Sequence, residues 1–258
     1  MKKVTNLHTV TSRSASIGAV VILLLLNSLL LPAFGQKEVV RTDQQWIQYF
    51  TQVQLDTHWL MLADAGYRVQ DGFTKRSLYI LRMGAGYRIN ETHRLIMGFV
   101  HTGSYGNEGL KLMEYRPYQE WGIAQRLGKI GLKHRFRIEE RFFKTVATEE
   151  LPSEASFNFR FRYSAMVSIP LVTLSARYPE RKLLLDVGEE IFVNAGQDIV
   201  YNVFDQNRVL LGTTVRFCKR LALSITYNHQ FRALNQANTY RLDRVFWLGL
   251  RNNISMVR

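Results

Sequence analysis

Alternation of apolar and polar residues with a period of two recurs along most of the chain and constrains its fold more than any other feature. In residues 157–163, every odd position carries an aromatic ring, and the positions between them carry Asn or Arg. In residues 135–139, Arg and Glu occupy the odd positions, whereas Phe136 and Ile138 occupy the even ones. Successive side chains of a β-strand point to opposite faces, so this period is typical of strands with two unlike faces. The sequence therefore predicts an all-β fold.

The alternating segments are about equally spaced, and turn residues separate them. We predict strands at 45–56, 59–69, 77–90, 93–105, 112–126, 131–143, 155–169, 181–194, 207–217, 220–231 and 240–252. Short connections are predicted near 56–57, 90–92, 128–131 and 218–219, and longer ones near 71–72, 103–111, 145–154 and 195–206. Short turns on one side and long loops on the other are typical of an antiparallel transmembrane β-barrel. The eleven segments indicate a barrel of about 10–12 strands. Because single-chain bacterial barrels usually have an even number of strands, we expect 10 or 12.

The first 35 residues have the order of a secretory signal peptide. Residues 1–16 are polar and basic, residues 17–31 are mostly apolar, and Ala33 and Gly35 are small. Basic, apolar and small-residue regions in this order predict a signal peptide over 1–35 with cleavage near Gly35-Gln36. A retained membrane anchor is the alternative. The predicted mature domain, residues 36–258, contains no apolar run of 18 residues, the length that a membrane-spanning helix requires.

The composition bears on where such a barrel would lie. Phe, Trp and Tyr make up 12% of the chain and occur in nearly every predicted strand. A soluble β-sandwich or a lipocalin-like barrel, with apolar residues inside, is the alternative architecture. Its small core rarely needs so many rings, whereas the lipid-facing wall and aromatic girdles of a membrane barrel do. We therefore expect an exported protein of the outer membrane of a Gram-negative cell, in contact with outer-membrane lipid and delivered by the barrel-assembly machinery.

Charge and cysteine content narrow the set of partners. The net charge is +13, and such an excess suits nucleic acid, an anionic lipid surface or an anionic solute. Export makes nucleic acid an unsuitable partner, which leaves a small anionic solute or lipopolysaccharide. A single cysteine, Cys218, excludes an internal disulfide. No pair of histidines has ligand spacing on one strand, so we expect no metal and no cofactor.

If the barrel is a membrane barrel, the charged face of its strands points into the lumen. The side chains concerned are Glu114, Arg116, Glu120, Arg135, Arg137, Glu139, Arg141, Arg160, Arg162, Glu190 and Arg208. Buried charges are tolerated only when they are paired and hydrogen-bonded, so we expect an Arg–Glu network across neighbouring strands. Such a network either fills a narrow barrel structurally or forms a cationic site, pore or constriction for an anion.

Five of these charged stretches also carry a family resemblance. They are EYRPYQ at 114–119, HRFRIEERF at 134–142, FRFRY at 159–163, EIFVN at 190–194 and FDQNR at 204–208. In this order they resemble an uncharacterised family of exported β-barrel proteins, common in Bacteroidetes-type bacteria and known only as a domain of unknown function. The resemblance covers nearly all of the predicted mature chain. It implies an outer-membrane barrel and brings no assigned activity.

Residues 205–208 suggest a further local role. Asp205 and Asn207 are predicted to cap the passage from a loop into a strand, because Asp and Asn side chains bond to nearby backbone in turns.

Enzymatic activity finds little support in the sequence. No G-x-S-x-G element is present, so we expect a non-enzymatic, porin-like or structural barrel. The alternative is an outer-membrane lipid-modifying hydrolase that uses His134 or His229, which both fall on the apolar face of their strands.

Overall fold

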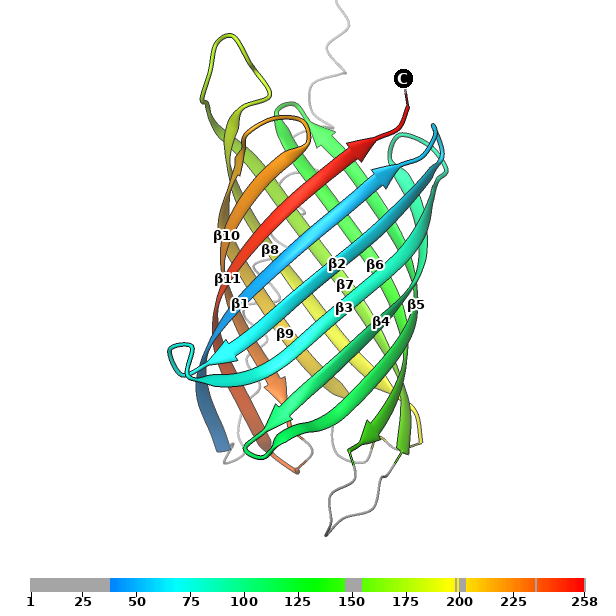
Figure 1. Cartoon of the computed structure of the whole chain (residues 1–258), viewed down its shortest axis with the longest axis vertical. Coiled ribbons are helices and arrows are strands. Elements are labelled where there is room, and N and C mark those ends of the chain that lie inside the picture. The colour runs from blue at the N-terminus through cyan, green and yellow to red at the C-terminus, as the bar shows by residue number, and fades with distance from the viewer. Residues whose placement is uncertain (1–37, 147–154, 198, 200–202, 235, 258) are drawn as a thin grey trace, which may run out of the picture. The chain divides into compact units, whose positions relative to one another are not determined.

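A computed structural model describes residues 38–146, 155–197, 199, 203–234 and 236–257. The predicted signal peptide, residues 1–35, lies outside the described residues and stays a prediction. The described residues form eleven strands and no helix (Figure 1). The strands are β1 (Glu38–Gln54), β2 (Trp59–Gln70), β3 (Lys75–Arg88), β4 (His93–Gly106), β5 (Gly109–Leu127), β6 (Ile130–Thr145), β7 (Ala155–Thr173), β8 (Lys182–Ala195), β9 (Phe204–Arg216), β10 (Leu221–Ala233) and β11 (Thr239–Ser255).

The strands close into one barrel in chain order, as the sequence predicts. Each consecutive pair is antiparallel, and β1 and β11 close the barrel in parallel, from Glu38 opposite Thr239 to Gln54 opposite Ser255. The number of strands lies within the expected range of 10–12, but the expectation of an even number is wrong. Strand direction alternates along the chain, so the first and last of eleven strands run the same way and must pair in parallel.

Ten of the strands coincide with the predicted segments to within about four residues, β1 begins seven residues earlier than predicted, and two connections predicted to be long are short. The predicted long loop at 103–111 is a tight turn, because β4 continues to Gly106 and Gly109 pairs with it. Gly109 has a φ of 128°, a conformation open to glycine that lets the chain reverse within two residues. The connection near 71–72, also predicted to be long, is the short turn of residues 71–74, whereas the connection between β7 and β8, residues 174–181, is longer than the other connections at its end of the barrel.

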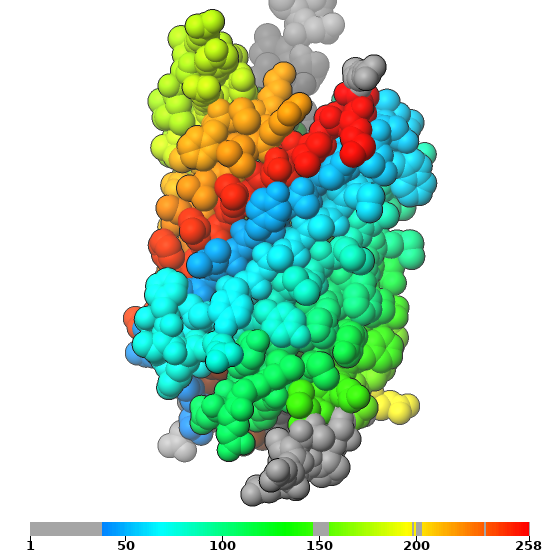
Figure 2. Space-filling model, in the orientation of Figure 1, coloured from blue at the N-terminus to red at the C-terminus, as the bar shows by residue number. Residues whose placement is uncertain are grey.

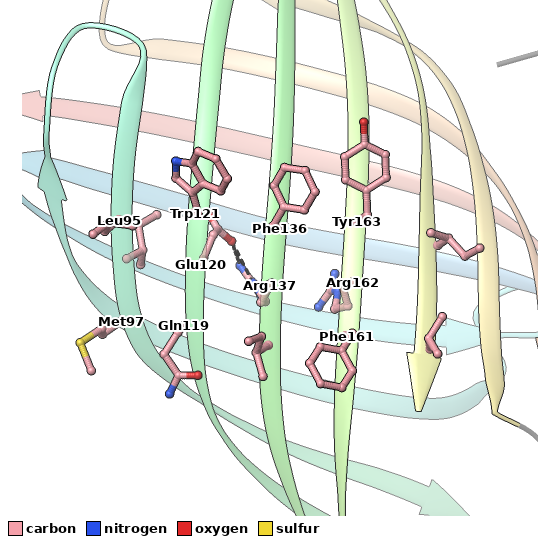
Figure 3. Close-up of a pocket in the computed structure, with 14 residues that line it drawn as sticks. Leu95, Met97, Gln119, Glu120, Trp121, Phe136, Arg137, Phe161, Arg162 and Tyr163 are labelled. Atoms are coloured by element: carbon pink, nitrogen blue, oxygen red, sulfur yellow. Dashed lines mark hydrogen bonds and ion pairs between the residues drawn. The ribbon is translucent and has the colours of Figure 1, made fainter. Parts of the chain in front are cut away.

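The outside of the barrel is apolar. Met83 and Met97 are 66% and 68% exposed, and exposed large apolar side chains occur on every strand. Trp121, Phe136 and Tyr163 stand side by side on β5, β6 and β7 (Figure 3). They border an apolar depression of about 720 Å³ in this outer wall. Figure 2 shows the wall as a continuous surface over β1 to β5. The described residues contain no helix long and apolar enough to cross a bilayer.

The inside of the barrel is filled by two kinds of side chain. Ile80, Ile96, Val100 and Tyr118 form a buried apolar cluster on β3, β4 and β5. The other buried side chains are mostly charged or amide groups, and they line the remaining inner wall. An interior this polar is stable only if its charges are paired, and the pairing defines the candidate site.

Candidate functional site

The predicted charged residues lie inside the barrel and belong to one connected set of ion pairs, here called the ion-pair layer. Its members are Glu114, Arg116, Glu120, Arg135, Arg137, Glu139, Arg141, Arg160, Arg162, Glu190 and Arg208. They come from β5, β6, β7, β8 and β9, whose alternation turns one charged face inward.

Glu139 is the centre of the ion-pair layer. Its side chain has no exposed surface, and four arginines surround it. Arg160 donates from Nε at 2.8 Å, and Arg162 donates from Nη1 at 2.5 Å. Arg116 and Arg137 stand further away, at 3.6 and 3.5 Å. One carboxylate thus carries the negative charge for arginines from three strands.

Three further glutamates extend the layer on either side of Glu139. Glu120 accepts from Nε of Arg137 at 2.9 Å, a contact drawn in Figure 3. Glu190 accepts from Nε of Arg162 at 3.0 Å and also contacts Arg135. The third, Glu114, accepts from Arg141 at 2.5 Å and lies 3.0 Å from Arg116. Such charge-assisted contacts hold each guanidinium in one orientation.

Several of these arginines lie over the faces of aromatic rings. The guanidinium of Arg137 lies 4.2 Å from the centre of the Tyr118 ring. Arg162 and Arg208 lie 4.4 and 4.6 Å from the ring of Phe192, which is fully buried. Cation–π contacts of this kind stabilise a desolvated arginine. Tyr118 shares the parity of Glu114 and Glu120, and Phe192 shares that of Glu190, so the alternation that turns these charges inward also turns the two rings inward.

The prediction of a loop-to-strand cap at Asp205 and Asn207 is wrong, because both residues lie within β9. Val193 pairs with Phe204 and Phe192 pairs with Gln206, so Asp205 is the extra residue of a β-bulge. The bulge turns Asp205 inward, where its carboxylate accepts from Nη1 of Arg160 at 3.0 Å. Asn207 instead donates to Glu189 of β8 at 2.6 Å.

Two further carboxylates inside the barrel were not among the predicted residues. Asp243 has no exposed surface and accepts from Nε2 of Gln230 at 3.1 Å, with Arg232 and Arg241 at 3.3 and 2.8 Å. Asp64 lies 3.1 Å from Arg82 on the neighbouring strand. Each occupies a position of its strand, β11 or β2, whose side chains point into the barrel. The alternation of the strand is therefore the sequence signal that could have identified them.

The inner wall is basic at the rim where β1 and β11 end. Lys133 has the inward parity of β6 and is exposed, which places it on a solvated part of the wall. The charged groups that act on it most strongly are Arg251, Arg94, Arg216 and one acid, Asp186. That acid already accepts hydrogen bonds from hydroxyl groups of two neighbouring strands. A pocket of about 600 Å³ opens at the same rim, and its lining includes Gln54, Arg88, Lys219 and Arg220.

The two histidines of the hydrolase alternative lie on the outer wall. Nδ1 of His134 is 2.9 Å from the hydroxyl of Tyr163, and Nδ1 of His229 is 3.4 Å from that of Tyr227. In the part of the chain that the structure describes, neither ring hydrogen-bonds a serine or a carboxylate. The same residues hold no group of three or more His, Cys, Asp or Glu arranged for a metal ion.

Comparisons with known proteins give a family and no function. No curated protein and no solved structure matches the chain. One family model matches residues 43–241, which include all members of the ion-pair layer and ten of the eleven strands in whole or in large part. The chain therefore belongs to the family described as protein of unknown function (DUF2490).

Proposed function

We propose that this chain is a non-enzymatic outer-membrane β-barrel that binds a small anionic solute inside the barrel. The observation that carries the membrane part is the inversion of polarity between the two walls. Glu139 has no exposed surface inside, whereas Met97 is 68% exposed outside. A soluble barrel buries its apolar side chains and exposes its charges, whereas a lipid-facing barrel does the reverse.

Strand length and the aromatic rings support the same location. The shortest strand, β2, has 12 residues, and a tilted strand needs about 9–11 to cross the hydrocarbon of a bilayer. Outer-wall pairs such as His93 with Trp121 and His58 with Tyr87 are amphipathic rings of the kind found at bilayer interfaces. The apolar depression beside Trp121 is suited to bind the acyl chain of a lipid.

Fractionation tests the location. Expressed with its N-terminal segment in a Gram-negative host, the protein is expected in the outer-membrane fraction, to resist carbonate extraction, and to require detergent for solution. Recovery of the mature chain as a monomer that is soluble without detergent would contradict the proposal.

The excess of arginine over carboxylate supports binding of an anion. Each glutamate of the ion-pair layer is shared by two or more arginines, and the rim beside Lys133 adds further cations. The layer itself is nearly closed, since Arg137, Arg160 and Glu190 are at most 6% exposed. A barrel filled in this way is suited to bind a solute from its basic rim rather than to conduct ions.

Two measurements on the purified protein test this part. In planar bilayers we expect no steady conductance, and in detergent micelles we expect calorimetric binding of inorganic phosphate that weakens in the double variant Lys133→Gln/Arg251→Gln. Lys75→Gln, at the exposed first residue of β3, is the control that leaves binding unchanged. A lasting anion-selective conductance would show a pore instead, and absence of anion binding would leave a purely structural barrel.

A further inference from the structure

Arg68 differs from the arginines of the ion-pair layer because it has no acidic partner among the described residues. It lies on β2 directly opposite Trp46 of β1, and its guanidinium carbon is 3.7 Å from the centre of the Trp46 ring. Among the described residues, no hydrogen bond or ion pair to Arg68 is found. Its partner is therefore an aromatic face, which attracts a cation but does not neutralise its charge.

The surroundings of Arg68 are positively charged. The charged groups that act on it most strongly are Arg208, Arg116, Arg82 and Arg162. Arg208 approaches the same ring, with its guanidinium carbon 5.4 Å from the centre of Trp46. An uncompensated charge in a protein interior is costly, and like charges beside it raise the cost. The side chains around Arg68 include no acid that would neutralise this cluster. A negatively charged group from outside the protein would lower its electrostatic cost.

Unpartnered hydrogen-bond donors lie along the same stretch of wall. Trp247 is paired with Trp46 across the closing strands, and the two ring centres are 5.5 Å apart. Nε1 of Trp247 is buried and has no partner in the structure. Asn228, on the neighbouring strand β10, has no exposed surface, and neither of its amide atoms has a partner. Buried donors of this kind usually have an acceptor, which here is absent from the protein itself.

We propose that a small oxyanion, the carboxylate or phosphate group of a solute, binds inside the barrel against Arg68 on the wall formed by Trp46 and Trp247. The inference rests on the proposed function and deepens it, because it names the residue that holds the anion. A guanidinium presents two parallel N–H donors, which match the oxygen pair of a carboxylate or phosphate better than a spherical halide. Because the Arg68 guanidinium lies over the Trp46 ring, its donors are already oriented in the absence of the anion.

The test compares thermal unfolding of the wild type and Arg68→Met in detergent micelles, in a zwitterionic buffer of low ionic strength. Without added anion, Arg68→Met is expected to melt higher than the wild type, because the substitution removes an unpaired charge beside four arginines. Inorganic phosphate is expected to raise the melting temperature of the wild type in proportion to the logarithm of its concentration. In Arg68→Met we expect phosphate to bind about tenfold more weakly or not at all, as for loss of a charge-assisted hydrogen bond.

Three comparisons make the outcome decisive. Acetate is expected to act as phosphate does, and chloride at the same ionic strength to act less. Arg244→Met removes an exposed arginine of the outer wall and is the matched control, for which the response to phosphate stays that of the wild type. If Arg68→Met is destabilised equally with and without phosphate, or binds phosphate as the wild type does, the inference is wrong. Binding that is lost in Lys133→Gln/Arg251→Gln but kept in Arg68→Met would overturn this inference alone and leave the proposed function standing.

Discussion

Nη1 of Arg160 donates a 3.0 Å hydrogen bond to Oδ2 of Asp205, and this contact connects β7 with β9 across the intervening β8. The bond exists because a β-bulge adds one residue to β9 and turns Asp205 from the outer parity to the inner wall. A local irregularity of one strand thus supplies a carboxylate to a layer that is rich in arginine.

Asp205→Ala is expected to destabilise the barrel by about 1–3 kcal/mol, because it removes the acceptor of a charge-assisted hydrogen bond while Arg160 keeps its contact with Glu139. Urea unfolding in micelles or vesicles measures the change. Asp43→Ala removes an exposed ion pair with Arg244 and is the control, expected within about 1 kcal/mol of the wild type. Equal effects of the two variants would contradict the inward role of Asp205.

Glu139→Ala is expected to cost about 3–5 kcal/mol, since it leaves four buried arginines without their shared carboxylate. The same unfolding experiment measures it, together with the shift of the folded band on unheated gels. Glu91→Ala, at an exposed turn between β3 and β4, controls for the loss of a glutamate. A change near zero would mean that the layer is not sealed from water.

Met97→Arg tests whether lipid surrounds the outer wall. Met97 lies on β4 and is 68% exposed, so in water an arginine there would be nearly neutral. In a bilayer, an arginine on the lipid face near the midplane costs about 2–4 kcal/mol. Phe73→Arg, in the turn between β2 and β3, is the control with a similar exposed fraction. Refolding into vesicles is the measurement, and equal stabilities for both variants would argue against lipid contact at Met97.

Gly98→Ala is expected to destabilise the barrel by about 1–3 kcal/mol through overpacking. A Cβ atom at Gly98 would lie 2.5 Å from the carbonyl oxygen of Met83 and 2.6 Å from the Tyr118 ring. The Tyr118 ring supports Arg137, so displacement of the ring also disturbs the ion-pair layer. Gly131→Ala is the control, because its Cβ would meet only ordinary contacts at 3.7 Å or more. The measurement is the melting temperature of each variant, and a decrease for Gly98→Ala that is no larger than for Gly131→Ala would contradict the prediction.

The turn between β1 and β2 is expected to lose stability in acid. Hydrogen bonds from the backbone N–H groups of Trp59 and then of His58 hold the pKa of Asp56 below its ordinary value of 3.8. A lowered folded-state pKa means that the contribution is present above pH 3.8 and is lost as the pH falls through the folded pKa. An NMR titration of the Asp56 carboxyl should have its midpoint below 3.8, with faster amide exchange of Trp59 at lower pH. In Asp56→Asn that pH dependence should disappear.

The strands and the members of the ion-pair layer could be predicted from the sequence because parity alone determines which side of a strand a residue faces. Arg137, Glu139 and Arg162 follow this rule, and the layer they form was expected for that reason. Trp46 and Phe192 follow the same rule, since Trp46 shares the parity of Gln48 and Phe192 that of Glu190. Parity does not show that each ring stacks with arginine, which only the contacts across the barrel reveal.

The remaining errors arise where one residue or one long-range pairing changes the register. The bulge at Asp205 shifts parity by one, and nothing in the local pattern of residues 204–208 indicates it. The tight turn from Gly106 to Gly109 depends on strand pairing that extends past the last alternating residue. Closure by β1 and β11 joins segments about 200 residues apart, and the parity of the strand count follows from that pairing rather than from any single segment.

The parallel pairing of β1 with β11 has a topological consequence for a barrel that crosses a bilayer. Glu38 begins β1 at one mouth, and Ser255 ends β11 at the opposite mouth, so the two strand ends would face different compartments. Of two epitopes, one placed before Glu38 and one after Val257, antibody would then reach only one on intact cells and both only after the outer membrane is permeabilised. The insertion machinery would also have to join two strands that run in the same direction, a seam that no hairpin of this chain can template.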